Sequence, residues 1–275
     1  MKQTRRTLLA GLLMSVFALA GCGGKQEAAQ EASAPQPEAS AAASGGDKEY
    51  IVGTDASYAP FEFQNDKQEI VGFDVDVLTA VAAKGGFKVK FVNTPWEGIF
   101  ATLAQGDRDM VISAVTITDE RKQSMDFSDP YFEARQLIAI GKGVTDVKKF
   151  ADLKGKKVAV QTGTTGDEVV QKLLGKTSAD IKRFESTPLA LKELESGGVQ
   201  AVVADNGVVI NYLKNNASNG IATVADNDSF APEFYGIAVK KGNAELQGKL
   251  NEGIKAIKAD GTYDKIYAKY FGEKK

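Results

Sequence analysis

Histidine is absent from the 275 residues of the chain, and cysteine occurs once, as Cys22. Without histidine, the sequence excludes Ser-His-Asp and Cys-His catalytic arrangements, histidine-based zinc sites and the commonest general base at neutral pH. A single cysteine excludes an intramolecular disulfide and a cysteine-rich metal site. We therefore expect a fold stabilised by its hydrophobic core, with no metal and no cofactor, and not an enzyme.

The sequence also lacks a strong excess of either basic or acidic residues. The sequence has 34 Lys and Arg against 36 Asp and Glu, for a net charge of −2. A nucleic-acid-binding domain usually carries a strong basic excess. Nucleic acid is accordingly excluded as an expected partner.

The N-terminus has the pattern of a lipoprotein export signal. A basic start ending at Arg6 precedes an apolar run over residues 8–20, which is too short to span a bilayer comfortably, and small residues then precede Cys22. We expect residues 1–21 to be a cleaved signal peptide and Cys22 to carry lipid as the mature N-terminus. The Arg5-Arg6 pair leaves the twin-arginine export route open beside the general one.

A polar segment follows the expected lipidation site. Residues 25–48 are almost wholly Ala, Glu, Gln, Ser, Pro and Gly without periodicity, which is typical of disorder. Residues 22–48 are therefore predicted to tether a globular part to a membrane. Gly23, in place of Asp, favours a periplasmic protein anchored in the outer rather than the inner membrane, and leaves open an additional role as a surface-exposed interaction protein.

Hydrophobic periodicity in the first part of the globular region alternates between strand and helix. Strands are predicted at residues 50–54, 87–91 and 110–113, with helices at 73–84 and 99–104 between them. This order predicts an α/β fold with a mostly parallel sheet flanked by helices. Ligands of such sheets bind beyond the carboxyl ends of the strands, so the loops after residues 54 and 113 are candidate binding loops.

A second group of elements repeats this order after Tyr131. The group comprises strands at 137–140, 158–160 and 201–204, a helix opened by the turn 163–166, and another helix with Thr187 as N-cap and Pro188 at its first position. The repetition predicts a second lobe of the same kind.

Charged and hydroxyl residues at these predicted strand ends suit a zwitterion. Burying a carboxylate and an ammonium group is tolerated only when each is paired and hydrogen-bonded. The planar fork of Arg121 can bind a carboxylate, with the hydroxyls of Ser113 and Thr116 nearby. The helix N-terminus at residues 163–166 offers a second anion-binding element.

Acidic and aromatic residues complete this set. Asp205, at the end of its strand, can take an ammonium group, and Asp55 can meet that group or a polar side chain. Tyr58 and Trp96 can sandwich an aliphatic stem. Taken alone, Arg121 would be a solvated helix charge and Asp205 a helix N-cap, and Asp74 and Asp76 are interpreted as first-turn helix charges.

Five segments together closely resemble the periplasmic polar-amino-acid-binding proteins of ABC importers, which form solute-binding protein family 3. They are residues 53–63, 72–76, 116–122, 126–131 and 260–263, and the likeness runs in the same order from residue 50 to 272. The resemblance implies a two-lobed periplasmic-binding-protein fold of type II with a two-stranded hinge near 131–135 and 233–236. Lobe 1 would comprise 49–133 and 234–275, and lobe 2 would comprise 134–233.

The resemblance also implies a ligand pocket and partners. Carried over by motif position, the pocket residues are Asp55, Tyr58, Trp96, Ser113, Ala114 through its backbone, Thr116, Arg121, Gln161, Thr164, Thr165 and Asp205. The implied partners of this monomer are a free L-amino acid and a membrane permease, to which hinge closure would deliver the ligand.

The resemblance leaves the ligand open among glutamine, a basic amino acid and cystine. The glutamine-binding branch has Lys at the position of Gln161 and His at that of Ala204, which disfavours strict glutamine specificity. An acidic ligand is disfavoured because its side chain would face Asp55 in a low-dielectric cleft. An enzyme on the same fold, similar to cyclohexadienyl dehydratase, is the alternative function.

Overall fold

The computed structural model describes residues 48–216 and 220–273. The expected signal peptide, Cys22 and all but the last residue of the expected tether lie outside these ranges. In the described part, no helix has both the length and the apolar character needed to cross a membrane.

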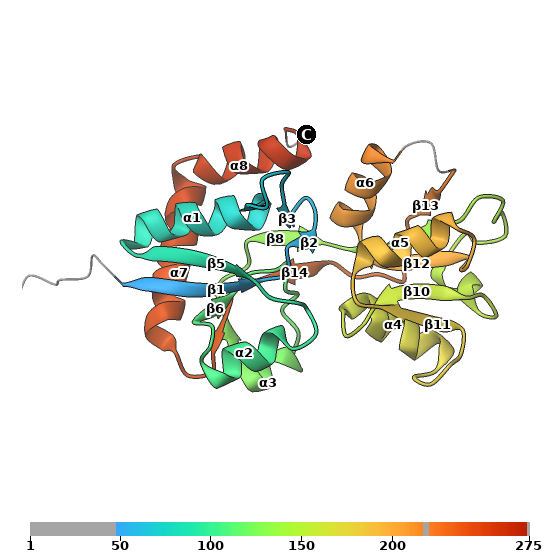
Figure 1. Cartoon of the computed structure of the whole chain (residues 1–275), viewed down its shortest axis with the longest axis horizontal. Helices are drawn as coiled ribbons and strands as arrows, with labels where there is room; N and C mark the ends of the chain where they lie inside the picture. Colours follow the sequence, from blue (N-terminus) through green and yellow to red (C-terminus); the bar gives the residue numbers. More distant parts are fainter. Residues whose placement is uncertain (1–47, 217–219, 274–275) are drawn as a thin grey trace, which may run out of the picture. The chain divides into compact units, whose positions relative to one another are not determined.

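The first lobe is built on a five-stranded mixed sheet (Figure 1). Its strand order is β5 (Lys88–Asn93), β1 (Glu49–Thr54), β6 (Met110–Val111), β15 (Ala238–Lys240) and β7 (Met125–Phe127). The first three strands are parallel, and β15 pairs antiparallel with both β6 and β7. The strand that inserts between β6 and β7 therefore comes from a segment more than 100 residues further along the chain.

Alternate residues of this sheet pack against helices on opposite faces. Val52 and Met110 belong to a core shared with α1 (Phe73–Gly85), α7 (Ala244–Ala259) and α8 (Thr262–Phe271). Val111 and Ala238 belong to a core shared with α2 (Ile99–Gln105). Because successive side chains of a strand point to opposite faces, the hydrophobic pattern specifies both helix layers.

The second lobe has the same plan. Its strand order is β11 (Ile181–Phe184), β10 (Val158–Gln161), β12 (Ala201–Asp205), β9 (Gln136–Ile140) and β13 (Ala222–Val224). Strands β11, β10 and β12 are parallel, whereas β9 pairs antiparallel with β12 and β13. Figure 1 shows α4 (Thr165–Leu174) and α5 (Thr187–Glu195) on opposite sides of this sheet, and α6 (Asn206–Asn215) follows β12.

The chain crosses between the lobes through a two-stranded sheet. Strands β8 (Phe132–Ala134) and β14 (Glu233–Tyr235) pair antiparallel, with Glu233 opposite Ala134. A further small antiparallel sheet of the first lobe consists of β2 (Ser57–Tyr58), β3 (Glu62–Gln64) and β4 (Ile70–Val71). The observed fold is thus the two-lobed α/β architecture that the sequence predicted.

The start of α5 corrects one detail of the sequence analysis. The N-cap is Ser186, and Thr187, predicted to be the N-cap, is already helical. The hydroxyl of Thr187 instead donates to Gln161 Oε1 at 2.9 Å. The side chain of Thr187 therefore binds a residue distant in the sequence, whereas local propensity predicted that it would cap the helix.

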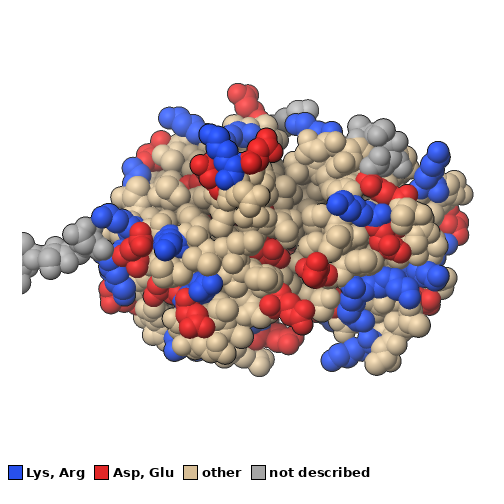
Figure 2. Space-filling view, in the orientation of Figure 1, with Lys and Arg blue, Asp and Glu red and all other residues tan. Residues whose placement is uncertain are grey.

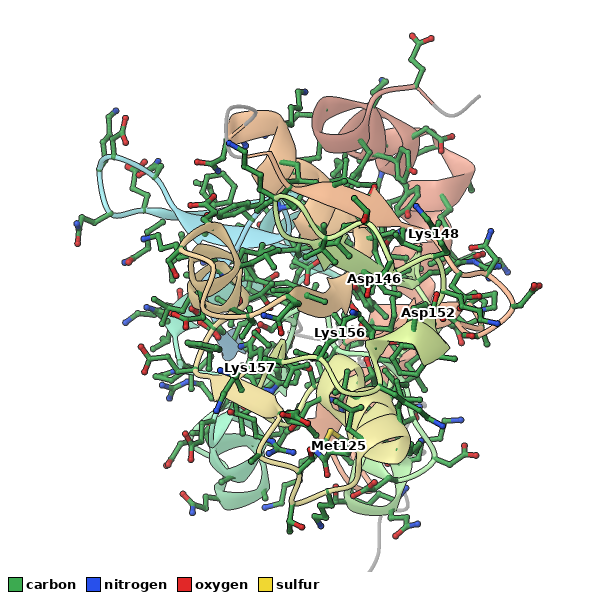
Figure 3. All side chains as sticks on the ribbon, turned by 90° about the vertical axis from the view of Figure 1, so that its right-hand side faces the viewer. Met125, Asp146, Lys148, Asp152, Lys156 and Lys157 are labelled. Carbon is green, nitrogen blue, oxygen red and sulfur yellow. The ribbon has the colours of Figure 1, made fainter. Side chains whose placement is uncertain are left out.

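Polar contacts hold the connection between β9 and β10, on which Figure 3 labels Asp146, Lys148, Asp152 and Lys156. Asp152, in the short 3-10 helix Phe150–Leu153, accepts from the backbone N–H groups of Lys148 and Lys149. Lys156 Nζ lies 2.6 Å from Asp146 Oδ2. None of these residues lines the cavity described below, so they provide sites for control substitutions.

Candidate ligand-binding site

A cavity lined by residues from both lobes contains about 320 Å³ of empty space, part of which is open to solvent. All eleven side chains or backbones predicted from the sequence line it, together with Glu62, which the prediction did not include. Most of them follow the carboxyl ends of β1, β5, β6, β10 and β12, as expected for α/β sheets. The described residues contain no group of three or more metal-ligating side chains placed to hold an ion.

Arg121, the first residue of α3 (Arg121–Ser124), is a buried cation in this cavity. Its Nη1 donates to Thr116 O at 2.9 Å, and its guanidinium lies 5.3 Å from the ring centres of both Trp96 and Phe100. Within the described ranges, no carboxylate oxygen lies at salt-bridge distance from it. Burial lowers the pKa of Arg121, although it remains protonated. The site thus holds a desolvated positive charge that an anion can neutralise.

The N-terminus of α4, expected from the sequence to be a second anion-binding element, contributes Thr164 and Thr165 to the cavity lining. Thr164 is its N-cap and accepts from the N–H of Asp167. A Cβ on Gly166 would lie 2.9 Å from Gln136 Oε1 and from Val203 O, so glycine permits this close approach to β12. Helices leave their first N–H groups without intrahelical acceptors, so this end favours a carboxylate.

Contacts from both sides fix the turn before α4. The N–H of Gly163 donates to Asp167 Oδ2 at 3.1 Å, and Asp167 is paired with Arg183. Arg121 Nη2 donates to Gly163 O at 3.4 Å. The guanidinium of one lobe and the helix N-terminus of the other therefore converge on one region of the cavity.

Asp205, at the end of β12, is a buried carboxylate without a cationic partner in the described part of the chain. It accepts from Tyr58 Oη at 3.0 Å, Tyr235 Oη at 2.5 Å and Gln136 Nε2 at 2.5 Å. It occupies the N-cap position of α6, but its side chain makes no capping hydrogen bond. This geometry leaves the carboxylate available to an ammonium group in the cavity.

Asp55 is a third charged group, at another part of the cavity. Its oxygens accept from Ser57 Oγ at 2.8 Å and from the backbone N–H of Trp96 at 3.3 Å. Gln161 Nε2 lies 3.5 Å from Asp55 Oδ2 and also donates to Glu185 O. Burial raises the pKa of Asp55. Because position 161 carries a neutral amide, Asp55 has no cationic partner among residues 48–216 and 220–273.

Glu233 contacts the same region and was not among the predicted site residues. Its Oε2 accepts from Thr116 Oγ1 at 2.9 Å and from Thr165 Oγ1 at 2.7 Å, so it joins hydroxyls from the two lobes. Its Oε1 accepts from Gln136 Nε2 at 3.2 Å. Carboxylates consequently outnumber cations around the cavity. In Figure 2, acidic side chains are also more prominent than basic ones where the lobes meet.

Ligand affinity is expected to depend on pH through Asp205. Burial, followed by the charge of Glu233, raises its pKa to about 6. Below that pH the carboxyl becomes neutral, and affinity for an ammonium group should fall by up to about tenfold per pH unit. Stability has the opposite sign, because a raised pKa stabilises the ligand-free fold at low pH and this contribution is lost as the pH rises through about 6.

The single tryptophan of the chain, Trp96, lines the cavity, so its fluorescence can report the pH dependence of ligand affinity. Fluorescence titrations between pH 5 and 8 should show the fall in wild-type protein and a flatter profile in Asp205→Asn. A wild-type profile that is flat down to pH 5 would contradict the assignment.

Comparison with known proteins identifies related sequences along the whole described region. Residues 50–273 match the model of bacterial extracellular solute-binding proteins, family 3. A probable histidine-binding protein of Neisseria gonorrhoeae is 46% identical over 270 residues, which cover 98% of this chain and 96% of that protein. The L-arginine-binding protein of Pseudomonas aeruginosa is 37% identical, covering 82% of this chain and 88% of that protein.

A solved structure of an amino-acid-binding protein is also similar to this chain. The arginine-, lysine-, histidine-binding protein ArtJ of Geobacillus stearothermophilus has a TM-score of 0.79 and 47% sequence identity, covering 83% of this chain and 97% of that structure. These three relatives are named as binding proteins rather than enzymes.

Proposed function

Because the chain belongs to family 3 of the bacterial extracellular solute-binding proteins, and is a binding protein and not an enzyme, we propose that its ligand is a free basic L-amino acid, with arginine first. One observation carries this proposal: the cavity presents three separated charges, Arg121, Asp205 and Asp55, none with an oppositely charged partner in the described residues. The α-carboxylate, the α-ammonium group and a cationic side chain would neutralise them in turn. The names of the relatives above agree with this class.

The pocket residues would divide these three tasks between the lobes. Arg121 and the N-terminus of α4 would bind the carboxylate, with the hydroxyls of Thr116 and Thr165 beside it. Asp205 would bind the α-ammonium group. Tyr58 and Trp96 would enclose the aliphatic stem, which would direct the side chain to Asp55 and Gln161. Each charge would then be paired away from water, which is the condition for burying it.

Binding would favour closure of the lobes about β8 and β14. The carboxylate site uses Arg121 from lobe 1 and α4 from lobe 2, so its full set of contacts exists only when the lobes approach. A ligand shifts such an equilibrium by its difference in affinity for the two states. The lobe boundaries proposed for this motion are residues 49–133 with 234–275, and 134–233.

The closed form would deliver its amino acid to an ABC permease. We further propose that residues 1–21 direct export and that Cys22 anchors the protein through lipid in the periplasm, with residues 22–48 as a tether. The family is extracytoplasmic, which supports this placement. Metabolic labelling with a palmitate analogue, with Cys22→Ser as control, tests the anchor.

Asp55 decides between a basic and a neutral ligand. In Asp55→Asn, the affinity for arginine should fall about 10- to 100-fold, because a hydrogen bond to a charged group contributes roughly 1.5–3 kcal/mol. The affinity for glutamine should change little, since an amide side chain can pair with either residue.

Calorimetry or Trp96 fluorescence measures both affinities after bound ligand has been removed by unfolding. Asp152 does not line the cavity, so Asp152→Asn is the matched control and should behave as wild type. An unchanged ratio of arginine to glutamine affinity in Asp55→Asn would refute the basic-ligand proposal, whereas no saturable amino-acid binding at all would refute the function.

A further inference from the structure

Two carboxyl groups are completely buried at the wall of the cavity, where Glu62 is a lining residue and Asp74 is not. Glu62 belongs to β3 and Asp74 to the first turn of α1, and neither side chain is exposed to solvent. They lie within hydrogen-bonding reach of each other. In the described part of the chain, neither forms an ion pair with Lys or Arg. Asp74 lies in the first turn of α1, as the sequence analysis expected, but its side chain is buried.

The donors around this pair satisfy one oxygen of each carboxyl. Ser113 Oγ donates to Glu62 Oε1 at 2.9 Å. The backbone N–H of Ala114 and Tyr131 Oη both donate to Asp74 Oδ2, at 2.8 and 2.7 Å. The other two oxygens, Glu62 Oε2 and Asp74 Oδ1, have no hydrogen-bond partner among the described residues. One proton held between the carboxyls would supply the missing donor.

We propose that Glu62 and Asp74 share one proton, and that this carboxyl pair positions the Ser113–Ala114 turn in the wall of the ligand cavity. Two adjacent carboxylates cannot both stay ionised in a buried site without a counter-ion. A shared proton removes the repulsion and leaves the outer oxygens free to accept from the turn.

The turn needs such support because its backbone is strained. Ala114 has φ +47°, a left-handed conformation that non-glycine residues adopt only when their surroundings enforce it. Asp74 holds its N–H, while Glu62 holds the hydroxyl of Ser113. Ser113 Oγ in turn accepts from the N–H of Asp55. The pair thus fixes three residues that line the cavity.

The groups facing the pair are acidic or neutral. Glu62 interacts electrostatically with Asp74 and Asp55, and its negative charge contributes to the raised pKa of Tyr58. Asp74 faces Tyr131, whose backbone oxygen accepts from Tyr263. Burial and the charge of Asp74 raise the pKa of Glu62, and burial raises that of Asp74 to about 6. The proton is therefore retained into the neutral range, and its stabilising contribution is lost as the pH rises.

Amide substitutions test the shared proton without any ligand. Glu62→Gln or Asp74→Asn alone supplies a permanent N–H in place of the proton. The Tm of the wild-type protein should fall between pH 5 and pH 8 as the pair loses its proton, and each single variant should lack this part of the fall. The double variant brings two amides together and leaves donors unpaired, so its Tm should lie roughly 4 °C or more below that of either single variant.

Three results would overturn the shared proton. One is a double variant more stable than both single variants, as expected if repulsion between two ionised carboxylates were being relieved. Another is a pair of single variants that follow the wild-type pH profile. The third is single variants as unstable as Glu62→Ala.

The positioning role is tested by binding, and this part alone rests on the proposed function. Arginine affinity should fall at least about 10-fold in Glu62→Ala, with most of the loss recovered in Glu62→Gln, since about 1.4 kcal/mol corresponds to tenfold. Wild-type affinity in Glu62→Ala would overturn positioning. If wild-type protein binds no arginine, the proposed function fails while the Tm series still decides the shared proton.

Discussion

Replacing Arg121 by methionine is expected to lower the affinity for arginine at least ~30-fold, because removing one partner of a buried charge pair costs about 2–5 kcal/mol. The ligand-free fold should change far less, by no more than ~1–2 kcal/mol, since the lost hydrogen bond to Thr116 O is offset by relief from burying an unpaired cation. The variant should therefore lose ligand affinity while the stability of its ligand-free fold changes little.

Thermal unfolding with and without arginine measures both quantities. Wild-type protein at a ligand concentration 1,000 times Kd should gain ~4 kcal/mol of stability, and Arg121→Met should lose about half of this gain or more at the same concentration. Arg108→Met is the matched control, because Arg108 is in the same lobe and binds Thr94 Oγ1 outside the cavity. A ligand-induced stabilisation of normal size in Arg121→Met would exclude Arg121 as the carboxylate site.

Much of the fold was predictable because its determinants are local. Strand β12 has no charged residue before Asp205, and α5 has Leu191 and Leu194 on one face, so their periods are visible in the sequence. The strand ends then indicate where a ligand binds. By contrast, the pairing of β15 between β6 and β7 joins segments far apart in the chain, and no local pattern specifies it.

The candidate site was predictable where motifs are contiguous. The segment from Ser113 to Arg121 carries four lining residues within nine positions, Ala114 and Thr116 included, and the resemblance to a known family placed the others. Glu233 had no such signal, because its partners Thr116 and Thr165 are 117 and 68 residues away. Glu233 lies in the predicted hinge, and its contacts with the site are set by the tertiary structure rather than by a local sequence pattern.

Asp74 shows why burial of a charged residue escapes sequence rules. An acidic residue in the first turn of a helix is favoured by the helix dipole and is usually solvated. Here the first turn of α1 lies under Ala114, and the side chain is fully buried. The partner that stabilises it, Glu62, lies in a separate strand, so only the tertiary structure reveals the pair.

Replacing Asp205 by asparagine is expected to lower the affinity for arginine about 30- to 1,000-fold, through loss of the charge that faces the α-ammonium group. The variant should still fold. Asparagine can accept from Tyr58 and Tyr235 through its oxygen. Its amide would face Gln136 Nε2, so the side-chain amide of Gln136 must turn over to accept through Oε1, a buried atom that has no partner among the described residues.

The charge on the ligand separates this role from a merely structural one. Agmatine, which lacks the carboxylate, should bind wild-type protein weakly and lose further affinity in Asp205→Asn, whereas an arginine analogue without the α-ammonium group should bind both proteins about equally. Asp152→Asn serves as the carboxyl-to-amide control in the same lobe. Equal losses for arginine and for the analogue without the ammonium group would mean that Asp205 shapes the cavity through its tyrosine contacts and does not pair with the ligand.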